Sequence, residues 1–202
     1  SYEARFTLED PDGVDGEAVK VVKVSTRAEP KAASGGRVRH VYSQYYTGEK
    51  LEPNYPGLVS AYNGSKDTKG DWYVVSEDKV QPGDIIKIHG GLYQGVLLNY
   101  PDWNNIPFDG TYFFTAKGTA ERPIVIEAAG DGEVIFDGAG AANLFNVMAT
   151  DHHIFQGLTF RNVGRVFDAG RKHLAGASNL TIRNCRFEDV GEGIRTEYAG
   201  SK

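Results

Sequence analysis

An internal repeat in the last quarter of the chain constrains the fold more than any other feature of the sequence. The segment GLTFRNVG at 157–164 aligns with NCRFEDVG at 184–191 at an offset of 27 residues, and the same offset pairs Phe167 with Ile194. The matched apolar positions are Leu158 with Cys185, Phe160 with Phe187 and Val163 with Val190. A period in the twenties, built from short strands, is typical of a parallel β-helix, in which each turn of the chain buries its inward side chains on its neighbours.

Short strand-like runs extend this pattern back to about residue 81. They are separated by glycine and asparagine, which excludes a helical domain. The runs are IIKI at 85–88, IVIE at 124–127, VIF at 134–136, LFNV at 144–147, IFQGLTF at 154–160, LTIRNCRF at 180–187 and GIRT at 193–196. An earlier, less regular turn of the helix is predicted through Ile124, Ile126, Val134, Phe136 and Phe145. We therefore predict an all-β fold, with a parallel β-helix (solenoid) over residues 81–202.

Two other regions precede this helix. The run AVKVVKVSTR at 18–27 alternates apolar and polar residues, as a half-buried strand does, and a loop-like stretch follows at 29–36. Residues 1–35 are therefore expected to be the terminal strand of an upstream β domain plus a linker. Residues 36–80 contain one strand-like run, VRHVYS at 38–43, and many aromatic residues without a helical period. This region is predicted to be the N-terminal cap of the solenoid.

Composition excludes several classes of function. The net charge of −5 is spread along the 202 residues, which argues against a nucleic-acid surface. The single cysteine, Cys185, excludes a disulfide framework, and its alignment with Leu158 places it in the interior. The sequence has no apolar run long enough to span a membrane. The three carboxylates at 10–15 suit calcium but lack the spacing of an EF-hand loop, so a plain turn is expected.

Three segments resemble the opening coils of the pectate-lyase-like right-handed β-helix proteins, and most of all the group that contains alginate and chondroitin lyases. They are PGDIIKIHGGLYQG at 82–95, GTAERPIVIEAAGDGEVIFDG at 118–138 and HHIFQGLTFRNV at 152–163. The resemblance covers about residues 81–202 and is specific for the fold. It implies a right-handed helix from an extracellular, cell-surface or periplasmic protein whose partner is a polysaccharide. It also implies a Lys or Arg base on an outer strand face, with calcium or a second Arg neutralising a uronate carboxylate; no other cofactor is expected.

The 27-residue offset also selects candidate site residues. It stacks Asp168 with Arg195 and Gly170 with Glu197, and Asn146 is expected in the same column one turn earlier. The basic loop that follows Ala169 lies at the edge of this column. The predicted catalytic residues are Asp168, Arg195, Lys172 and Arg171, and the predicted substrate-binding residues are Asn146, His173, Glu197 and Trp103. The alternative interpretation is a salt bridge between turns on a solvated face, beside a solubilising loop.

Other polar residues are interpreted structurally. Adjacent strand residues point to opposite faces, so His152 and His153 are not expected to chelate one metal. Alignment with Leu180 predicts that His153 is buried, while His152 faces outward beside Asp151. Three asparagines fall at corners, where asparagine tolerates a left-handed backbone: Asn162, Asn179 and Asn184.

These observations predict an extracellular protein that cleaves an acidic polysaccharide, as a lyase or a hydrolase, in a groove along its outer face. The alternative is a non-catalytic glycan-binding or structural surface module, such as an adhesin; a trimeric tail-spike-like assembly is a third. The repeat is still running at Lys202, so further coils or a partner are expected to cover that end.

Overall fold

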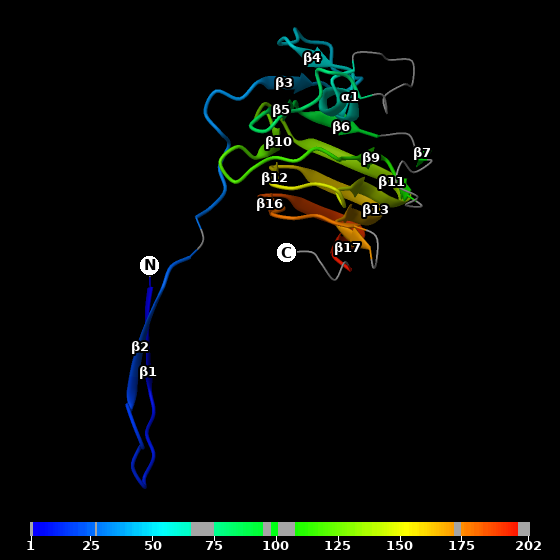
Figure 1. Ribbon diagram of the computed structural model, residues 1–202. Helices are drawn as coiled ribbons and strands as arrows, with labels where there is room; N and C mark the ends of the chain where they lie inside the picture. Colours follow the sequence, from blue (N-terminus) through cyan, green and yellow to red (C-terminus); the bar gives the residue numbers. More distant parts are fainter. Residues whose placement is uncertain are drawn as a thin grey trace.

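The computed structural model describes residues 2–26, 28–65, 75–94, 98–100, 108–171 and 175–197. Within them the regular secondary structure is mostly β-strand, and the strands stack along one direction of the main body (Figure 1). The fold is therefore all-β, as the sequence predicts. One short helix, α1 (Leu58–Asn63), lies among the described residues, and none of these residues form a helix long and apolar enough to cross a membrane.

The larger of the two main sheets has six strands, and every neighbouring pair in it is parallel. Its order is β16-β12-β10-β5-β3-β4. The strands are β3 (Val38–Val41), β4 (Asn54–Tyr55), β5 (Ile85–Ile88), β10 (Ile124–Ala128), β12 (His153–Gln156) and β16 (Thr181–Arg183). Because β3 and β4 belong to this sheet, the sheet extends into the region that precedes residue 81.

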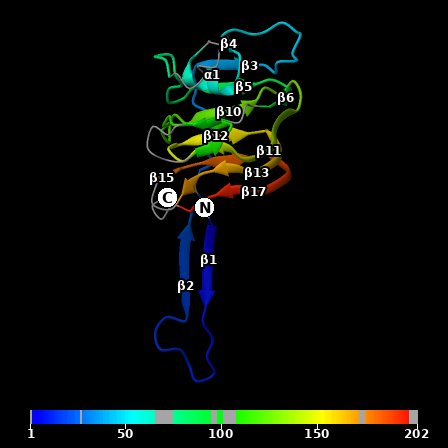
Figure 2. The same cartoon turned by 90° about the vertical axis from the view of Figure 1, so that its right-hand side faces the viewer.

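The second sheet is also parallel and has the order β17-β13-β11-β6, with β9 paired to β11 beside this path. Its strands are β6 (Gly91–Tyr93), β9 (Tyr112–Phe113), β11 (Val134–Asn146), β13 (Thr159–Asp168) and β17 (Arg186–Arg195). The chain passes repeatedly from the six-stranded sheet to this one, from β5 to β6, β10 to β11, β12 to β13 and β16 to β17 (Figure 2). Phe160 pairs with Phe187 and Phe167 with Ile194, at the offset that the sequence alignment predicts.

Left-handed residues occur at the corners between these strands, at Asn179 and Asn184, and within the strand β13, at Asn162. Asn162, Asn179 and Asn184 have φ angles of 52°, 50° and 52°, as predicted for corner positions. Gly157 lies one offset before Asn184 and has a φ of 71°. Asparagine and glycine adopt this conformation at low cost, so they allow a sharp change of direction at the same place in successive passes.

Phenylalanine rings fill the space between the sheets. Phe136, Phe160 and Phe187 share one register position on β11, β13 and β17, with ring centroids 6.0 and 5.4 Å apart. Phe136 and Phe160 are fully buried, whereas 37% of Phe187 is exposed. Phe145 and Phe167 are also register partners, and their buried rings meet edge to face at a centroid distance of 5.4 Å. The predicted inward residues of the earlier turn are all fully buried: Ile124, Ile126, Val134, Phe136 and Phe145.

The structure corrects several predicted elements. The runs at 134–136 and 144–147 are parts of the single strand β11, and Gly157 and Asn184 interrupt the two long runs that were predicted around them. The sequence showed no helical period in 37–80, yet α1 forms there and packs against β3, β4, β5 and β9. Six residues span less than two helical turns, which is too short to show a period.

Residues 2–24 form an antiparallel hairpin of β1 (Tyr2–Thr7) and β2 (Val19–Val24), which extends away from the two main sheets (Figure 1). Val21 and Val24 are each 48% exposed, whereas Val19 and Val22 are partly buried. The hairpin has only two strands, and no further strand covers either of its faces among the described residues. Two small antiparallel pairs complete the fold: β7 (Leu98–Tyr100) with β8 (Phe108–Gly110), and β14 (Gly170–Arg171) with β15 (Ala175–Gly176).

Candidate functional site

A polar column crosses one end of the second sheet. Asn146, Asp168 and Arg195 are register partners on β11, β13 and β17, as the sequence predicts. Glu197 follows the column, and its backbone N–H donates to the carbonyl of Gly170 at 3.1 Å. Four of the predicted site residues are therefore brought together by the parallel pairing of three strands.

This column is more enclosed than the sequence suggested. Asp168 and Asn146 have no exposed surface, so the expected solvated face is wrong for these two residues. The physical reason is that neighbouring segments cover them. The Asn146 side-chain oxygen accepts a hydrogen bond from the backbone N–H of Met148 at 3.0 Å. Met148 is buried against Phe113 of β9 and against Ala175 of the β14–β15 hairpin.

The charged side chains around Asp168 form ion pairs with Asp168 or with one another. Arg171, which opens the hairpin, donates to Asp168 Oδ2 from Nε at 3.0 Å and from Nη2 at 2.9 Å. Arg165 Nη1 lies 4.0 Å from the same oxygen, and its Nε donates to Glu192 at 2.6 Å. Arg195 pairs with Glu197, which raises the pKa of Arg195. Asp168 therefore pairs with Arg171 and, at a longer distance, with Arg165, whereas Arg195 pairs with Glu197 and not directly with Asp168.

Three buried polar atoms in the column have no hydrogen-bond partner among the described residues. They are Asp168 Oδ1, Asn146 Nδ2 and Arg195 Nε. Most buried polar atoms in folded proteins are hydrogen-bonded, so three exceptions in one column form an acceptor and donor set without a protein partner. Hydroxyl groups, which both donate and accept, match this set chemically.

The remaining predicted site residues, Lys172, His173 and Trp103, lie outside the described residues.

The histidine pair behaves as predicted. His153 is fully buried, while the His152 ring lies 2.8 Å from Asp151 and is partly exposed. His153 Nε2 faces the hydroxyl of Tyr62 at 2.9 Å, and its Nδ1 faces the carbonyl of Asp151 at 3.0 Å. Burial lowers the pKa of His153 to about 4. Across the described ranges, no group of three or more His, Cys, Asp or Glu residues is arranged to hold a metal ion.

A second polar row, on the outer face of the six-stranded sheet, was missed by sequence reasoning. Its members are register partners on five successive strands: His40, Lys87, Glu127, Gln156 and Arg183. Lys87 Nζ lies 2.6 Å from Glu127, and Arg183 Nε donates to Gln156 at 2.6 Å. Part of the signal was present, because four of the five follow an apolar residue within a strand, whereas His40 follows Arg39. It required the register between strands, which the sequence supplied only for the last two turns.

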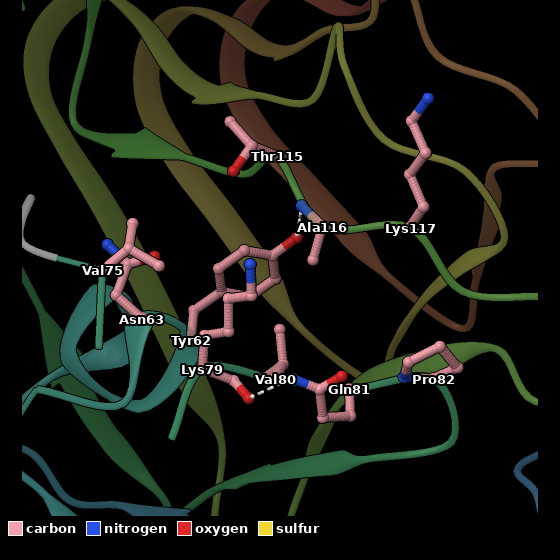
Figure 3. A pocket seen from close by; sticks show the side chains of 10 residues that line it. All are labelled: Tyr62, Asn63, Val75, Lys79, Val80, Gln81, Pro82, Thr115, Ala116 and Lys117. Atoms are coloured by element: carbon pink, nitrogen blue, oxygen red, sulfur yellow. Dashed lines mark hydrogen bonds between the residues drawn. The ribbon is translucent and has the colours of Figure 1, made fainter. Parts of the chain in front are cut away.

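A cavity of about 540 Å³ lies between α1 and the segments that precede β5 and follow β9 (Figure 3). The hydroxyl of Tyr62 accepts the backbone N–H of Ala116 at 2.8 Å at its wall. Lys79 and Lys117 also line the cavity, but Lys117 extends away from Tyr62 (Figure 3). The lining therefore lacks a convergent charged set among the described residues.

The linker lies along the outer row. Arg183 Nη1 lies 2.8 Å from Glu29 and 2.9 Å from the carbonyl oxygen of Pro30. A cavity of about 780 Å³ separates residues 28–34 from the corner that contains His152 and Asn179.

A scan of protein-family models and searches of curated proteins and of solved structures found no match to this chain.

Proposed function

We propose that the two parallel sheets are faces of a right-handed parallel β-helix, of the pectate-lyase-like type, in an extracellular protein that binds and cleaves an acidic polysaccharide. The observation that carries the proposal is the repeated passage between the two parallel sheets, from β10 and β11 through β16 and β17, in which each strand pairs in parallel with the matching strand of the next pass. Stacked passes of this kind build long outer faces on which side chains from successive strands form rows, and such rows suit a linear polymer.

The polar column supplies groups that suit an acidic sugar. Arg165, Arg171 and Arg195 surround Asp168, and a guanidinium group binds a carboxylate through two parallel hydrogen bonds. Two of these cations are paired with Glu192 and Glu197, whose side chains are 54% and 52% exposed. Exposed ion pairs contribute little stability, so a uronate carboxylate can replace either glutamate at small cost.

Cleavage would follow if one cation neutralises the uronate carboxylate while a nearby base removes the adjacent proton. Arg195 is best placed for the first role, because its Nε has no partner among the described residues and its side chain is 31% exposed. Asp168 is a positioning residue in this proposal, since it holds Arg171 and has no exposed surface.

One observation favours a non-catalytic glycan-binding or structural module as the second candidate. Every described charged side chain in the cluster is already paired with an oppositely charged one. A lyase or hydrolase needs a base or acid that is free to exchange protons with the substrate.

The test is to incubate the protein with alginate and with polygalacturonate, and to follow unsaturated uronate absorbance, reducing ends and binding heat. Absorbance growth supports a lyase, and reducing ends alone support a hydrolase. Arg195→Gln is expected to weaken binding and turnover at least about tenfold. Arg186→Gln is the matched control, because Arg186 is 66% exposed and lies on the same strand outside the column, and it should change neither. Binding without products supports the second candidate, and no binding to either polymer contradicts both.

A further inference from the structure

Three side chains from separate segments meet beside the outer row of the six-stranded sheet. Asp131 Oδ2 lies 2.6 Å from His89 Nδ1, and His89 Nε2 lies 2.9 Å from His40 Nδ1. The two imidazole centroids are 5.2 Å apart, about as far as two rings joined nitrogen to nitrogen at 2.9 Å can reach. The nitrogens therefore face each other along one hydrogen bond, whereas two ligands of a metal would both point toward a third position.

Glycines flank this arrangement and allow its two turns to touch. A Cβ on Gly90 would lie 2.6 Å from the Cα of Gly132, so the turn after β5 and the turn after β10 are in direct contact. This contact places Asp131 against His89, and the Gly90 N–H donates to Asp131 Oδ1 at 3.0 Å. Both carboxylate oxygens of Asp131 are therefore in hydrogen-bond contact with the turn after β5, one with His89 and the other with Gly90.

The His89 ring is held in place from other sides as well. The Tyr42 ring stacks on it at a centroid distance of 4.0 Å and an angle of 12°. The hydroxyl of Tyr93 donates to the His89 carbonyl at 2.6 Å. His89 is buried, so its orientation is fixed by packing and hydrogen bonds together.

The order of donors and acceptors follows from Asp131. Burial acts to raise the pKa of Asp131, but the hydrogen bonds from His89 and the Gly90 N–H together lower it below its usual value. An ionised carboxylate only accepts, so His89 carries its hydrogen on Nδ1 and, when neutral, accepts at Nε2. His40 then donates from Nδ1, which leaves its Nε2 without a hydrogen.

The outer nitrogen of His40 is open to a ligand. His40 Nε2 has no partner among the described residues and is not one of their buried unpartnered atoms. Burial lowers the pKa of His40, and the charges of His89 and Lys87 lower it further, so the ring is neutral at pH 7. The charged groups facing the two rings are Asp131, Lys87 with its partner Glu127, and Lys50, which lies 5.7 Å from the Tyr42 ring centre.

We propose that Asp131, His89 and His40 form a proton relay, with His40 Nε2 as a general base that accepts a proton from the hydroxyl group of a bound sugar or water. The hydroxyl O–H bond breaks and a bond to His40 Nε2 forms. The hydrogen on His40 Nδ1 then moves to His89 Nε2, so the positive charge comes to lie beside the Asp131 carboxylate. A base oriented by a third group is the common plan of activated catalytic sites. The relay is separate from the Asp168 column and does not depend on its function.

Reaction with diethyl pyrocarbonate measures the reactivity of this nitrogen. The bare imidazole nitrogen attacks one carbonyl carbon, the ring loses its other N–H proton, and ethanol and carbon dioxide leave. His152 is an internal reference, because it also contacts a carboxylate, Asp151 at 2.8 Å, but no second imidazole. Mapped by peptide mass spectrometry at pH 7, His40 is expected to react about tenfold faster than His152. Asp131→Asn and His89→Gln should each slow His40 about tenfold and leave His152 unchanged. A His40 rate no faster than that of His152, or unchanged in both variants, overturns the proposal.

The position of the hydrogen on His40 provides a second measurement on the unmodified chain. Two-bond nitrogen-15 NMR correlation spectra above the pKa of His40 are expected to show its hydrogen on Nδ1 and none on Nε2. In the relay, Asp131 sets the position of the hydrogen on His89 and thereby the position of the hydrogen on His40. Asp131→Asn should therefore shift His40 toward the tautomer that carries its hydrogen on Nε2. A hydrogen on Nε2 of His40 in the wild-type chain contradicts the relay.

Discussion

At the scale of single residues, His153 couples stability to pH. Its folded-state pKa of about 4 lies below the ordinary 6.5 because the ring is buried. Above pH 6.5 the ring is neutral in both states, and the full stability is present. Between pH 6.5 and 4 only the unfolded chain takes up the proton at this histidine, so the His153 contribution lowers stability by about 3 kcal/mol as the pH falls, and this contribution changes no further below pH 4. Urea unfolding at pH 7 and pH 4.5 measures this loss.

The control for this prediction removes the titrating group. His153→Gln retains an acceptor for the Tyr62 hydroxyl but no titration, so its loss of stability between the two pH values should be smaller by about 2–3 kcal/mol. His152→Gln should keep the wild-type pH dependence, since His152 is partly exposed. Equal pH dependence in wild type and His153→Gln would contradict the assignment.

Arg39 is a buried cation whose partners come from three segments. Only 1% of it is exposed, and its Nη1 donates to the Tyr55 hydroxyl at 3.0 Å and to the Ala61 carbonyl at 3.1 Å, while Nη2 lies 3.2 Å from Asp78. Arg39→Met removes these buried hydrogen bonds, although Arg37 and the Tyr55 hydroxyl still donate to Asp78, and it is expected to cost about 3–5 kcal/mol of unfolding free energy in urea. Arg186→Met, at a 66% exposed side chain, should cost less than about 1 kcal/mol. Equal costs would show that the Arg39 network does not stabilise the fold.

At the scale of elements, corner residues need a left-handed backbone. Asn184 has a φ of 52°, and Gly157 occupies the matching corner of the preceding pass. Asn184→Gly should change the unfolding free energy by less than about 1 kcal/mol, whereas Asn184→Val should cost about 1–3 kcal/mol, because a β-branched residue is strained there. Thr181→Val, on the extended strand β16, is the matched control and should be nearly neutral. A tolerated valine at 184 would refute the strain argument.

The elements that the sequence predicted are those with a local pattern. Alternation and the 27-residue offset located the strands from 154 onward and their register, because each strand pairs with a copy of itself. The helix α1 and strand β1 had no such pattern: α1 is six residues long, and the exposed Phe6 and Tyr2 of β1 mark no buried face. Their structure depends on partners that lie elsewhere in the chain.

At the scale of the whole molecule, the candidate sites also contain features that the sequence predicted and features that it did not. The Asn146–Asp168–Arg195 column was predictable because it follows from register alone. The burial of Asp168 was not, since it depends on the β14–β15 hairpin and on the Met148 turn. The contact between His40 and His89 joins residues 49 positions apart, and that between Tyr62 and His153 joins residues 91 apart. In each pair one residue lies between positions 36 and 80, a region that has no internal repeat to align.

The phenylalanine stack predicts a gradient of packing along the molecule. Phe160 has rings on both sides, at 6.0 Å from Phe136 and 5.4 Å from Phe187, and is fully buried. Phe160→Ala is therefore expected to cost about 3–5 kcal/mol in urea unfolding. Phe187 has a ring neighbour on β13 but is 37% exposed, so Phe187→Ala should cost only about 1–2 kcal/mol. A cost at Phe187 equal to that at Phe160, and dependent on protein concentration, would mean that a second copy of the chain covers β17 in solution, because association stabilises only the folded state.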